Sequence, residues 1–230
     1  KKLPDAHVQS DAVHPTGRVN VTLQNGKPTY EILAEVAWDY IRFDQNLRDL
    51  ASRADAVCFG SLAQRSPVSR STIQAFLEAM RPEALRIFDV NLRQNFYSKE
   101  ILEPSLRPAN IFKLSDEELP VLAAMFDLMG DARTQLHRLR ELFDLRLVAY
   151  TRGGSGSLLL TANETSDHLG LPTQVIDTVG AGDSFTATLC MGLLKNLPLA
   201  ETNIRANRVA AFVCSQAGAT PTLPDAIIES

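Results

Sequence analysis

At residues 177–185 the chain reads Asp177-Thr178-Val179-Gly180-Ala181-Gly182-Asp183-Ser184-Phe185. An extended segment, 173–177, precedes this stretch, and an apolar helix is expected from about 181 to 195. The small residues at 180–182 let the backbone approach a ligand closely, and the unpaired N–H groups of a helix's first turn attract anions. The stretch therefore predicts an anion site where a helix begins.

The same stretch also carries a carboxylate, Asp183, which an anion site does not need for binding. A base beside a phosphate explains the combination: Asp183 accepts the proton of an attacking hydroxyl while the amides hold the transferring phosphoryl group. The alternative is that Asp183 only favours the helix start by its charge and that the glycines form a tight turn. The residues taken alone leave both readings open.

Outside this stretch, short apolar runs alternate with helical patterns. Buried strands are expected at 56–60, 85–89, 110–114 and 145–150, and a helix is expected to start at Ser66-Pro67, an N-cap followed by proline. Two closing helices, at about 181–195 and 202–217, are so apolar that they should be largely covered. This order is typical of an α/β domain with a mostly parallel sheet, whose ligands lie beyond the carboxyl ends of the strands.

A β-hairpin is expected before this domain. Residues 18–23 alternate polar with aliphatic or β-branched side chains, Asn25-Gly26 supplies a tight-turn signal, and a second extended run follows from Thr29. The pattern predicts a hairpin that is polar on one face.

Composition excludes several classes of protein. With 230 residues, 45% of them hydrophobic and 22% charged, the chain is long enough for one globular core, and its net charge of −4 gives no reason to expect a nucleic-acid partner. Its three cysteines are far apart in the sequence and form no disulfide or metal-binding pattern, which fits a reducing, cytoplasmic environment. No run reaches the roughly 18 apolar residues of a membrane span. Neither a P-loop nor a dinucleotide-binding glycine motif occurs in the sequence.

Other segments carry weaker signals. Residues 151–156, between a strand and the apolar run 157–161, suggest a hairpin turn. Asp89, Asn91 and Arg93 place an acid, an amide and a guanidinium at a strand end, although Asp89 could cap a turn while Arg93 is solvated. Ser115 to Glu118 has the S-x-x-E pattern of a capping box, which requires no ligand. Trp38 is interpreted as a packing residue.

The stretch 177–185 resembles the C-terminal signature D-T-x-G-A-G-D-x-F of the ribokinase-like (PfkB) carbohydrate kinases, and every specified position matches. Within that family the runs 37–40, 59–65 and 88–94 look most like bacterial fructokinases. The resemblance implies a three-layer α/β/α sandwich with a mostly parallel central sheet and a small β lid. It divides the chain into a lid region, 1–35, and an α/β nucleotide- and substrate-binding domain, 36–230. The family's first strand and its N-terminal glycine pair have no counterpart, so a missing N-terminal piece is expected.

The resemblance also assigns site residues. Asp183 is implied as the base, and the amides of Gly180, Ala181 and Gly182 as the anion hole. Nucleotide contacts are implied for Thr151, Gly153, Gly156, Asn207 and Lys113. Substrate or phosphate contacts are implied for Asn91 and Arg93 and, from the lid, for Arg18 and Asn20.

Two cation sites are implied in the same way. Glu118 is expected to help position Mg²⁺, and Asp89 to order the water shell of this metal ion. Ser115 stands where the family has asparagine, a departure that bears on magnesium or phosphate handling. Asp177 and Thr222 are expected to contribute side chains to a loop that binds a monovalent cation such as K⁺, although Gly218-Ala219 read by itself is a helix C-cap.

The function implied is transfer of the γ-phosphoryl group of ATP to a sugar hydroxyl, with fructose as the first expectation for the substrate. The alternatives are a sister kinase for 2-keto-3-deoxygluconate, ribose or a nucleoside, and a sensor that binds nucleotide or sugar without transfer, for which Ser115 is the only hint. ATP, Mg²⁺ and K⁺ are the implied cofactors. The implied partners are a small sugar and a second copy of the chain that docks through the lid.

Overall fold

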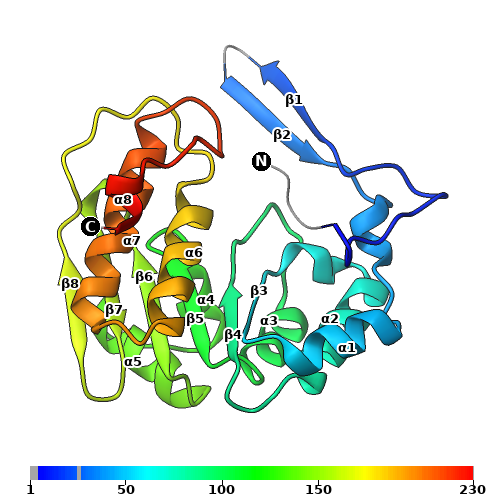
Figure 1. The fold of residues 1–230 in the computed structure, drawn as a ribbon, viewed down its shortest axis with the longest axis horizontal. Coiled ribbons are helices and arrows are strands. Elements are labelled where there is room, and N and C mark those ends of the chain that lie inside the picture. The colour runs from blue at the N-terminus through cyan, green and yellow to red at the C-terminus, as the bar shows by residue number, and fades with distance from the viewer. Residues whose placement is uncertain (1–4, 25–26, 230) are drawn as a thin grey trace.

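The structure is a computed structural model that describes residues 5–24 and 27–229 (Figure 1). Its strands are β1 Val19–Gln24, β2 Lys27–Ile32, β3 Ala56–Phe59, β4 Leu85–Asp89, β5 Ile111–Ser115, β6 Leu147–Thr151, β7 Ser157–Leu160 and β8 Thr165–His168. Its α-helices are α1 Gln45–Arg53, α2 Pro67–Ala79, α3 Lys99–Leu106, α4 Leu119–Met125, α5 Ala132–Leu142, α6 Ala181–Leu194, α7 Leu199–Cys214 and α8 Asp225–Glu229. Short 3₁₀ helices lie at η1 Ala37–Tyr40, η2 Leu62–Arg65 and η3 Gly153–Ser155.

In the described part of the chain, six strands form one sheet in the order β3-β4-β5-β6-β7-β8. The pairs from β3 to β6 are parallel, and β7 and β8 add antiparallel strands at one side. Helices connect the parallel strands, as such crossovers require, whereas β6 and β7 are joined by the short η3 turn. The predicted mostly parallel sheet is confirmed.

Side chains that alternate along the central strands supply two separate cores. Phe88 of β4 and Phe112 of β5 point to the face that is covered by α2, α3, α4 and α5. Ile87 and Ile111, their neighbours in sequence, point to the opposite face, where Phe185 of α6 and Ala206 of α7 pack. The result is a sandwich of helices, sheet and helices, with α6 and α7 in front of the sheet in Figure 1.

The first two strands form a separate antiparallel sheet that pairs Val19 with Ile32. In Figure 1 this hairpin projects from the upper end of the molecule, the end at which α6 begins. The hairpin is confirmed as an element, but its turn at Asn25-Gly26 and the side chains of 21–30, on which its predicted polar face depends, lie outside the described residues.

Several predicted boundaries are corrected. The last long helix runs from Leu199 to Cys214, so it begins three residues before the predicted start. The extended segment 173–177 is not a strand, and β8 was not predicted. The closing helices are also less covered than expected, because only one stripe of each packs on the sheet, and Met191 and Ile204 remain exposed.

Candidate active site

The first turn of α6 is the centre of the candidate site. Gly180 precedes this helix with φ of +82°, and a Cβ there would lie 2.3 Å from the carbonyl oxygen of Ala219. Both the positive φ and the close backbone require glycine. Asp183 lies exposed in the first helical turn, among amides that have no helical acceptor. The arrangement predicted from the signature, a carboxylate beside an open helix N-terminus, is therefore present.

A buried polar cluster lies next to this turn. Asp89 ends β4, and its Oδ1 accepts a hydrogen bond of 3.1 Å from the Lys113 ammonium on β5. Its Oδ2 accepts one of 2.9 Å from the hydroxyl of Thr186 on α6. Burial raises the pKa of Asp89, Lys113 opposes that rise, and the Glu118 carboxylate adds to it. The cluster thus joins β4, β5 and α6, and Glu118 lies close to it.

The same cluster lies near the edge strand β3. Cys58 on β3 is exposed as a residue, but its thiol is largely desolvated. This desolvation raises the thiol pKa to about 12, and the carboxylates of Asp89 and Asp183 add to the rise. Cys58 is therefore a neutral thiol at ordinary pH. Because the carboxylates of Asp89 and Asp183 both act on this one thiol, the two residues lie at the same end of the sheet.

Glu118 connects two loops at the carboxyl edge of the sheet. One of its carboxylate oxygens accepts the N–H of Ser115 at 2.7 Å, and its own N–H donates to the Ser115 hydroxyl at 3.3 Å, which confirms the predicted capping box. The other oxygen accepts the N–H of Leu92 at 2.8 Å. That second bond holds the 90–94 loop against the end of β5, and each oxygen keeps one lone pair for a water or a metal ion.

The 90–94 loop presents its polar groups outward. Asn91 has a φ of +41°, a left-handed conformation that asparagine tolerates better than most residues. Arg93 is exposed, and its guanidinium donates a 3.1 Å hydrogen bond to the carbonyl of Leu92. Arg93 is therefore solvated, which is the structural alternative considered for it in the sequence. An exposed guanidinium can reorient toward an anion.

Residues 151–156 form the turn between β6 and β7, which confirms the hairpin expected from their glycines. Gly156 has φ of +86°, and a Cβ there would lie 1.9 Å from the carbonyl oxygen of His168. Gly153 and Gly154 have no neighbouring atom within 4 Å of the same position. Gly156 is thus required by the contact of β7 with the end of β8, and the surface above Gly153 and Gly154 is open.

Asp177 ties the segment before α6 to the segment after α7. Its Oδ1 accepts the N–H of Val179 at 3.0 Å and its Oδ2 accepts the N–H of Gly218 at 3.1 Å. The two loops expected to hold a monovalent cation are therefore adjacent. Thr222 is exposed, and its part in such a loop stays a prediction.

The structure gives Asn207 and Lys113 protein partners in place of open nucleotide contacts. The Asn207 amide nitrogen donates to the Ser157 hydroxyl at 2.7 Å and to the carbonyl of Asn203 at 2.8 Å, inside the interface between α7 and β7. Lys113 is buried and paired with Asp89. Neither side chain is presented on the surface, because each satisfies a buried partner that would otherwise be left unpaired.

The lid candidates are on β1 and just before it. Arg18 and Asn20 are exposed, and the Asn20 amide donates to the Glu31 carboxylate across the hairpin at 3.2 Å. Among the described residues, no hydrogen bond or ion pair joins either residue to the first turn of α6. Their role as sugar contacts stays a prediction.

Two functional features were missed at the level of sequence. Thr186 carries no motif signal beyond its place three residues after Asp183, one turn along the same helix face. Arg65 lies in the run 59–65 and forms a buried pair with Asp39 of η1. For Thr186, the spacing of three residues from Asp183 is the one sequence signal that indicates a position on the same helix face. Arg65 has no comparable signal.

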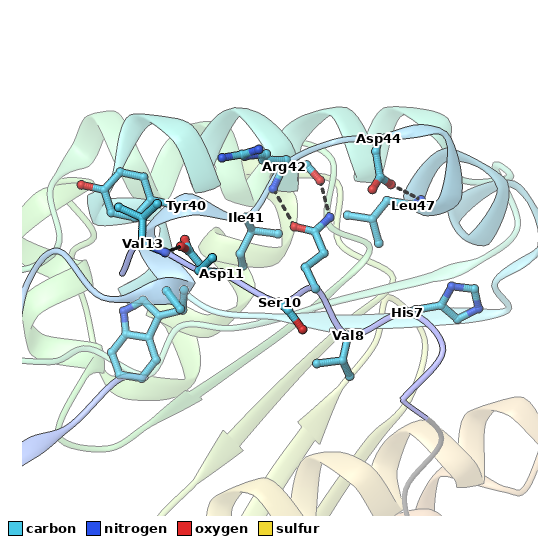
Figure 2. A pocket seen from close by; sticks show the side chains of 14 residues that line it. His7, Val8, Ser10, Asp11, Val13, Tyr40, Ile41, Arg42, Asp44 and Leu47 are labelled. Carbon is cyan, nitrogen blue, oxygen red and sulfur yellow. Dashed lines mark hydrogen bonds between the residues drawn. The ribbon is translucent and has the colours of Figure 1, made fainter. Parts of the chain in front are cut away.

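A cavity of about 900 Å³ lies elsewhere, between residues 7–13 and the region 37–47 (Figure 2). In it the side-chain amide of Gln9 exchanges two hydrogen bonds with the backbone of Arg42, as a neighbouring strand would. None of the candidate site residues lines this cavity. Residues 7–13, which the predicted division places in the lid region, line this cavity opposite residues of 37–47.

Within the described residues, no group of three His, Cys, Asp or Glu side chains could hold a metal ion by itself. No helix among them is both long and apolar enough to cross a bilayer.

Fold and site together define an α/β phosphotransferase of the ribokinase-like type, with an anion-binding helix start and a carboxylate at the carboxyl end of a parallel sheet. The model of the pfkB family carbohydrate kinases matches residues 2–226. The chain belongs to this family, and it is an ATP-dependent sugar kinase.

Individual relatives agree with this assignment. The chain is 29% identical to a fructokinase of Salmonella typhimurium over 224 residues, which are 94% of this chain and 71% of the relative. Fructokinase from Vibrio cholerae with fructose, ADP and calcium ion is similar with a TM-score of 0.75 and 26% identity, covering 95% of this chain and 74% of the other. Aminoimidazole riboside kinase from Salmonella enterica, with aminoimidazole riboside and an ATP analogue, has a TM-score of 0.77 and 25% identity, covering 96% and 75%.

Proposed function

We propose that this sugar kinase phosphorylates fructose, with Asp183 as the catalytic base. The observation that carries the base assignment is the position of Asp183 in the first turn of α6, beside the helix-start amides of 180–182 and at the end of the sheet where Asp89 and Glu118 lie. Fructose is favoured over other sugars by the fructokinases among its relatives.

In the proposed reaction, a sugar hydroxyl donates its proton to the Asp183 carboxylate as its oxygen attacks the γ-phosphorus of ATP. The amides of Gly180, Ala181 and Gly182 hold the negative charge of the transferring phosphoryl group. Because this transition state is loose, little proton removal is needed early, and a weak base such as a carboxylate suffices. ADP leaves from the side opposite the attacking oxygen.

ATP is proposed to lie over the open turn at Thr151, Gly153 and Gly154, where no atom occupies the space above the glycines. Arg93 is proposed to reach the phosphates from the 90–94 loop, since it is solvated and bound only to a neighbouring carbonyl. Lys113 is not given a direct phosphate contact here, because it is buried in its pair with Asp89.

The residues present fit an Mg²⁺ ion held mainly through water. Glu118 is half-buried at the site and each of its oxygens keeps a free lone pair, which suits a metal that retains several waters and takes one or two carboxylates with phosphates. Mg²⁺ would neutralise charge on the phosphates. Ser115 stands in place of the family asparagine, and its hydroxyl still accepts the N–H of Glu118. This bond holds the turn 115–118 in place.

A homodimer through the hairpin is a further part of the proposal. The sheet formed by β1 and β2 has two strands only, and such a sheet is at best marginally stable unless something packs on it. Sedimentation of the complete protein at several concentrations tests it: a monomer at all concentrations rejects this part alone.

The test of the base is the variant Asp183→Asn in the complete protein, which keeps the shape and removes the proton acceptor. We expect kcat with fructose to fall by roughly 10²- to 10⁴-fold, while ATP still binds, because general-base catalysis contributes about that factor. Asp225→Asn, in the first turn of α8, is the matched control and should leave kcat unchanged. Near-normal turnover of Asp183→Asn would refute the assignment.

The substrate is tested separately with ATP, Mg²⁺ and a panel of fructose, ribose, 2-keto-3-deoxygluconate and a riboside. Fructose should give the highest kcat/KM. The riboside is the second candidate, because the aminoimidazole riboside kinase is as similar in fold as the fructokinase. Preference for another sugar would replace fructose, and nucleotide binding without turnover of any sugar would favour a sensor.

A further inference from the structure

Three buried polar side chains form a network directly beneath the first turn of α6. Asp89, Lys113 and Thr186 are 7%, 7% and 3% exposed, and they come from β4, β5 and α6 respectively. Asp89 bonds both partners, Lys113 at 3.1 Å and Thr186 at 2.9 Å. None of the three side chains can reach solvent freely, so the network acts inside the protein.

The network touches the anion-binding turn itself at Gly182. The Lys113 nitrogen lies 3.4 Å from the position that a Cβ on Gly182 would occupy. The Thr186 hydroxyl also lies 3.0 Å from the carbonyl oxygen of Gly182. A hydroxyl has one proton, so it can serve either Asp89 or this carbonyl, and the carboxylate is the stronger acceptor.

These contacts have a steric and an electrostatic consequence. The packing of Lys113 against Gly182 and the bond from Thr186 to Asp89 restrict both the rotation and the distance of α6 relative to the sheet. The pair also places a positive charge behind the amides of 180–182. A buried ion pair is a weak source of stability, but it can specify one arrangement of the elements it joins.

We propose that Asp89, Lys113 and Thr186 are positioning residues that hold the first turn of α6 in one orientation, so that the amides of 180–182 and the Asp183 carboxylate face the reacting phosphoryl group. This inference rests on the proposed function for its effect on rate. Its structural part, the immobilisation of the turn by the network, can be measured without any turnover. Lys113 then acts through Gly182 and not by touching nucleotide.

The direct test is Thr186→Val, which removes the hydroxyl and keeps the shape of the side chain. Thr188→Val is the matched control. Thr188 is on the same helix and its hydroxyl also bonds the carbonyl four residues earlier, that of Ser184 at 2.8 Å, whereas the Asp89 carboxylate takes its bond from Thr186. Thr186→Ser restores the hydroxyl and serves as the rescue. All are made in the complete protein.

We expect Thr186→Val to lower kcat by about 10- to 100-fold, the range that a small misplacement of reacting groups produces. KM for the sugar and the dissociation constant for ATP should stay within about twofold, because the network touches neither ligand. Thr188→Val and Thr186→Ser should resemble wild type. Equal kcat values for Thr186→Val and Thr188→Val would overturn the inference, as would a loss confined to KM.

Hydrogen exchange of the segment 178–188 gives a readout independent of activity. Thr186→Val should exchange the hydrogen-bonded amides of this segment, such as that of Ser184, which donates to the Gly180 carbonyl at 2.9 Å, faster than Thr188→Val does under identical conditions, and unchanged exchange would overturn the inference. If Thr186→Val does not fold, Thr186→Ala replaces it, because alanine brings no methyl groups toward the carboxylate. An inactive wild type with normal exchange differences would reject the proposed function and leave the positioning network supported.

Discussion

Among single residues, Asp11 shows how local hydrogen bonds act on a carboxylate. Its oxygens accept the N–H groups of His14 at 2.9 Å and Val13 at 2.7 Å, and the His14 ring at 2.9 Å. The His14 ring is in turn stacked on Tyr40, with ring centroids 3.5 Å apart. Bonds to the ionised form lower a carboxyl pKa, and here the His14 N–H, the His14 ring and the Val13 N–H lower it to about 2.

This shift predicts an acid-dependent loss of stability. Because the folded pKa is about 2 and the ordinary value is 3.8, the contribution of Asp11 is present above pH 3.8 and is lost as pH falls toward 2. Carboxyl NMR should give a midpoint near 2. Asp11→Asn should flatten this part of the profile of unfolding free energy against pH, whereas a midpoint near 3.8 would contradict the contacts.

Asp183 and Asp89 show the same side chain in opposite environments. Asp183 is exposed at the start of α6, where a carboxylate can accept a proton from a substrate. Asp89 is buried, and burial raises its pKa despite the neighbouring Lys113. The sign is such that Asp89 makes folding less favourable as pH rises from 3.8 through its raised folded pKa. Only the exposed carboxylate is therefore a candidate base.

At the level of elements, the hairpin of β6 and β7 depends on one glycine. Gly156→Ala would place a Cβ 1.9 Å from a backbone oxygen at positive φ, so the chain must shift at the end of β8. We expect a loss of about 2 kcal/mol or more in unfolding free energy, since backbone strain of this kind costs roughly 1–3 kcal/mol.

Gly154→Ala is the control for this prediction. It is in the same turn but has no atom within 4 Å of its Cβ position. Urea unfolding of the two variants should separate a destabilised protein from one close to wild type. Equal stability of the pair would show that the turn adjusts freely, and would remove the structural reason for glycine at 156.

At the level of the whole molecule, Arg65 holds the base of the hairpin to the α/β domain. Its guanidinium makes two 2.9 Å bonds to Asp39 and a 2.5 Å bond to the carbonyl of Leu33, which follows β2. The Phe96 ring covers it with its centroid 4.6 Å away. One side chain therefore connects the hairpin, η1, η2 and the loop that precedes α3.

Arg65→Met should lower the unfolding free energy by about 3–5 kcal/mol, because it leaves Asp39 buried and unpaired. The pair is 8% and 5% exposed. Arg81→Met is the control, since its pair with Asp55 is 42% and 74% exposed and such pairs contribute about 1 kcal/mol or less. Urea unfolding measures both, and similar small losses would mean that Arg65 does not hold the hairpin.

Signals that span a few residues were sufficient for much of this protein. The helix start at 180–183 with its carboxylate, the hairpin turn at 151–156 and the capping box of Ser115 and Glu118 could all be predicted, because each depends on neighbours within about six positions. The alternation of strands and helices determined the layered fold for the same reason, since periodicity is a local property.

Only the tertiary structure showed what lies behind those segments. Asp89 meets Lys113 across 24 positions and Thr186 across 97, and Glu118 meets Leu92 across 26. It also showed that Lys113 and Asn207, for which nucleotide contacts were predicted, are buried among protein partners. Sequence alone determined the chemical groups at the start of α6 and the order of the elements. The partners that orient those groups were decided by packing, because burial brings together residues whose separation along the chain leaves no periodic or local signal.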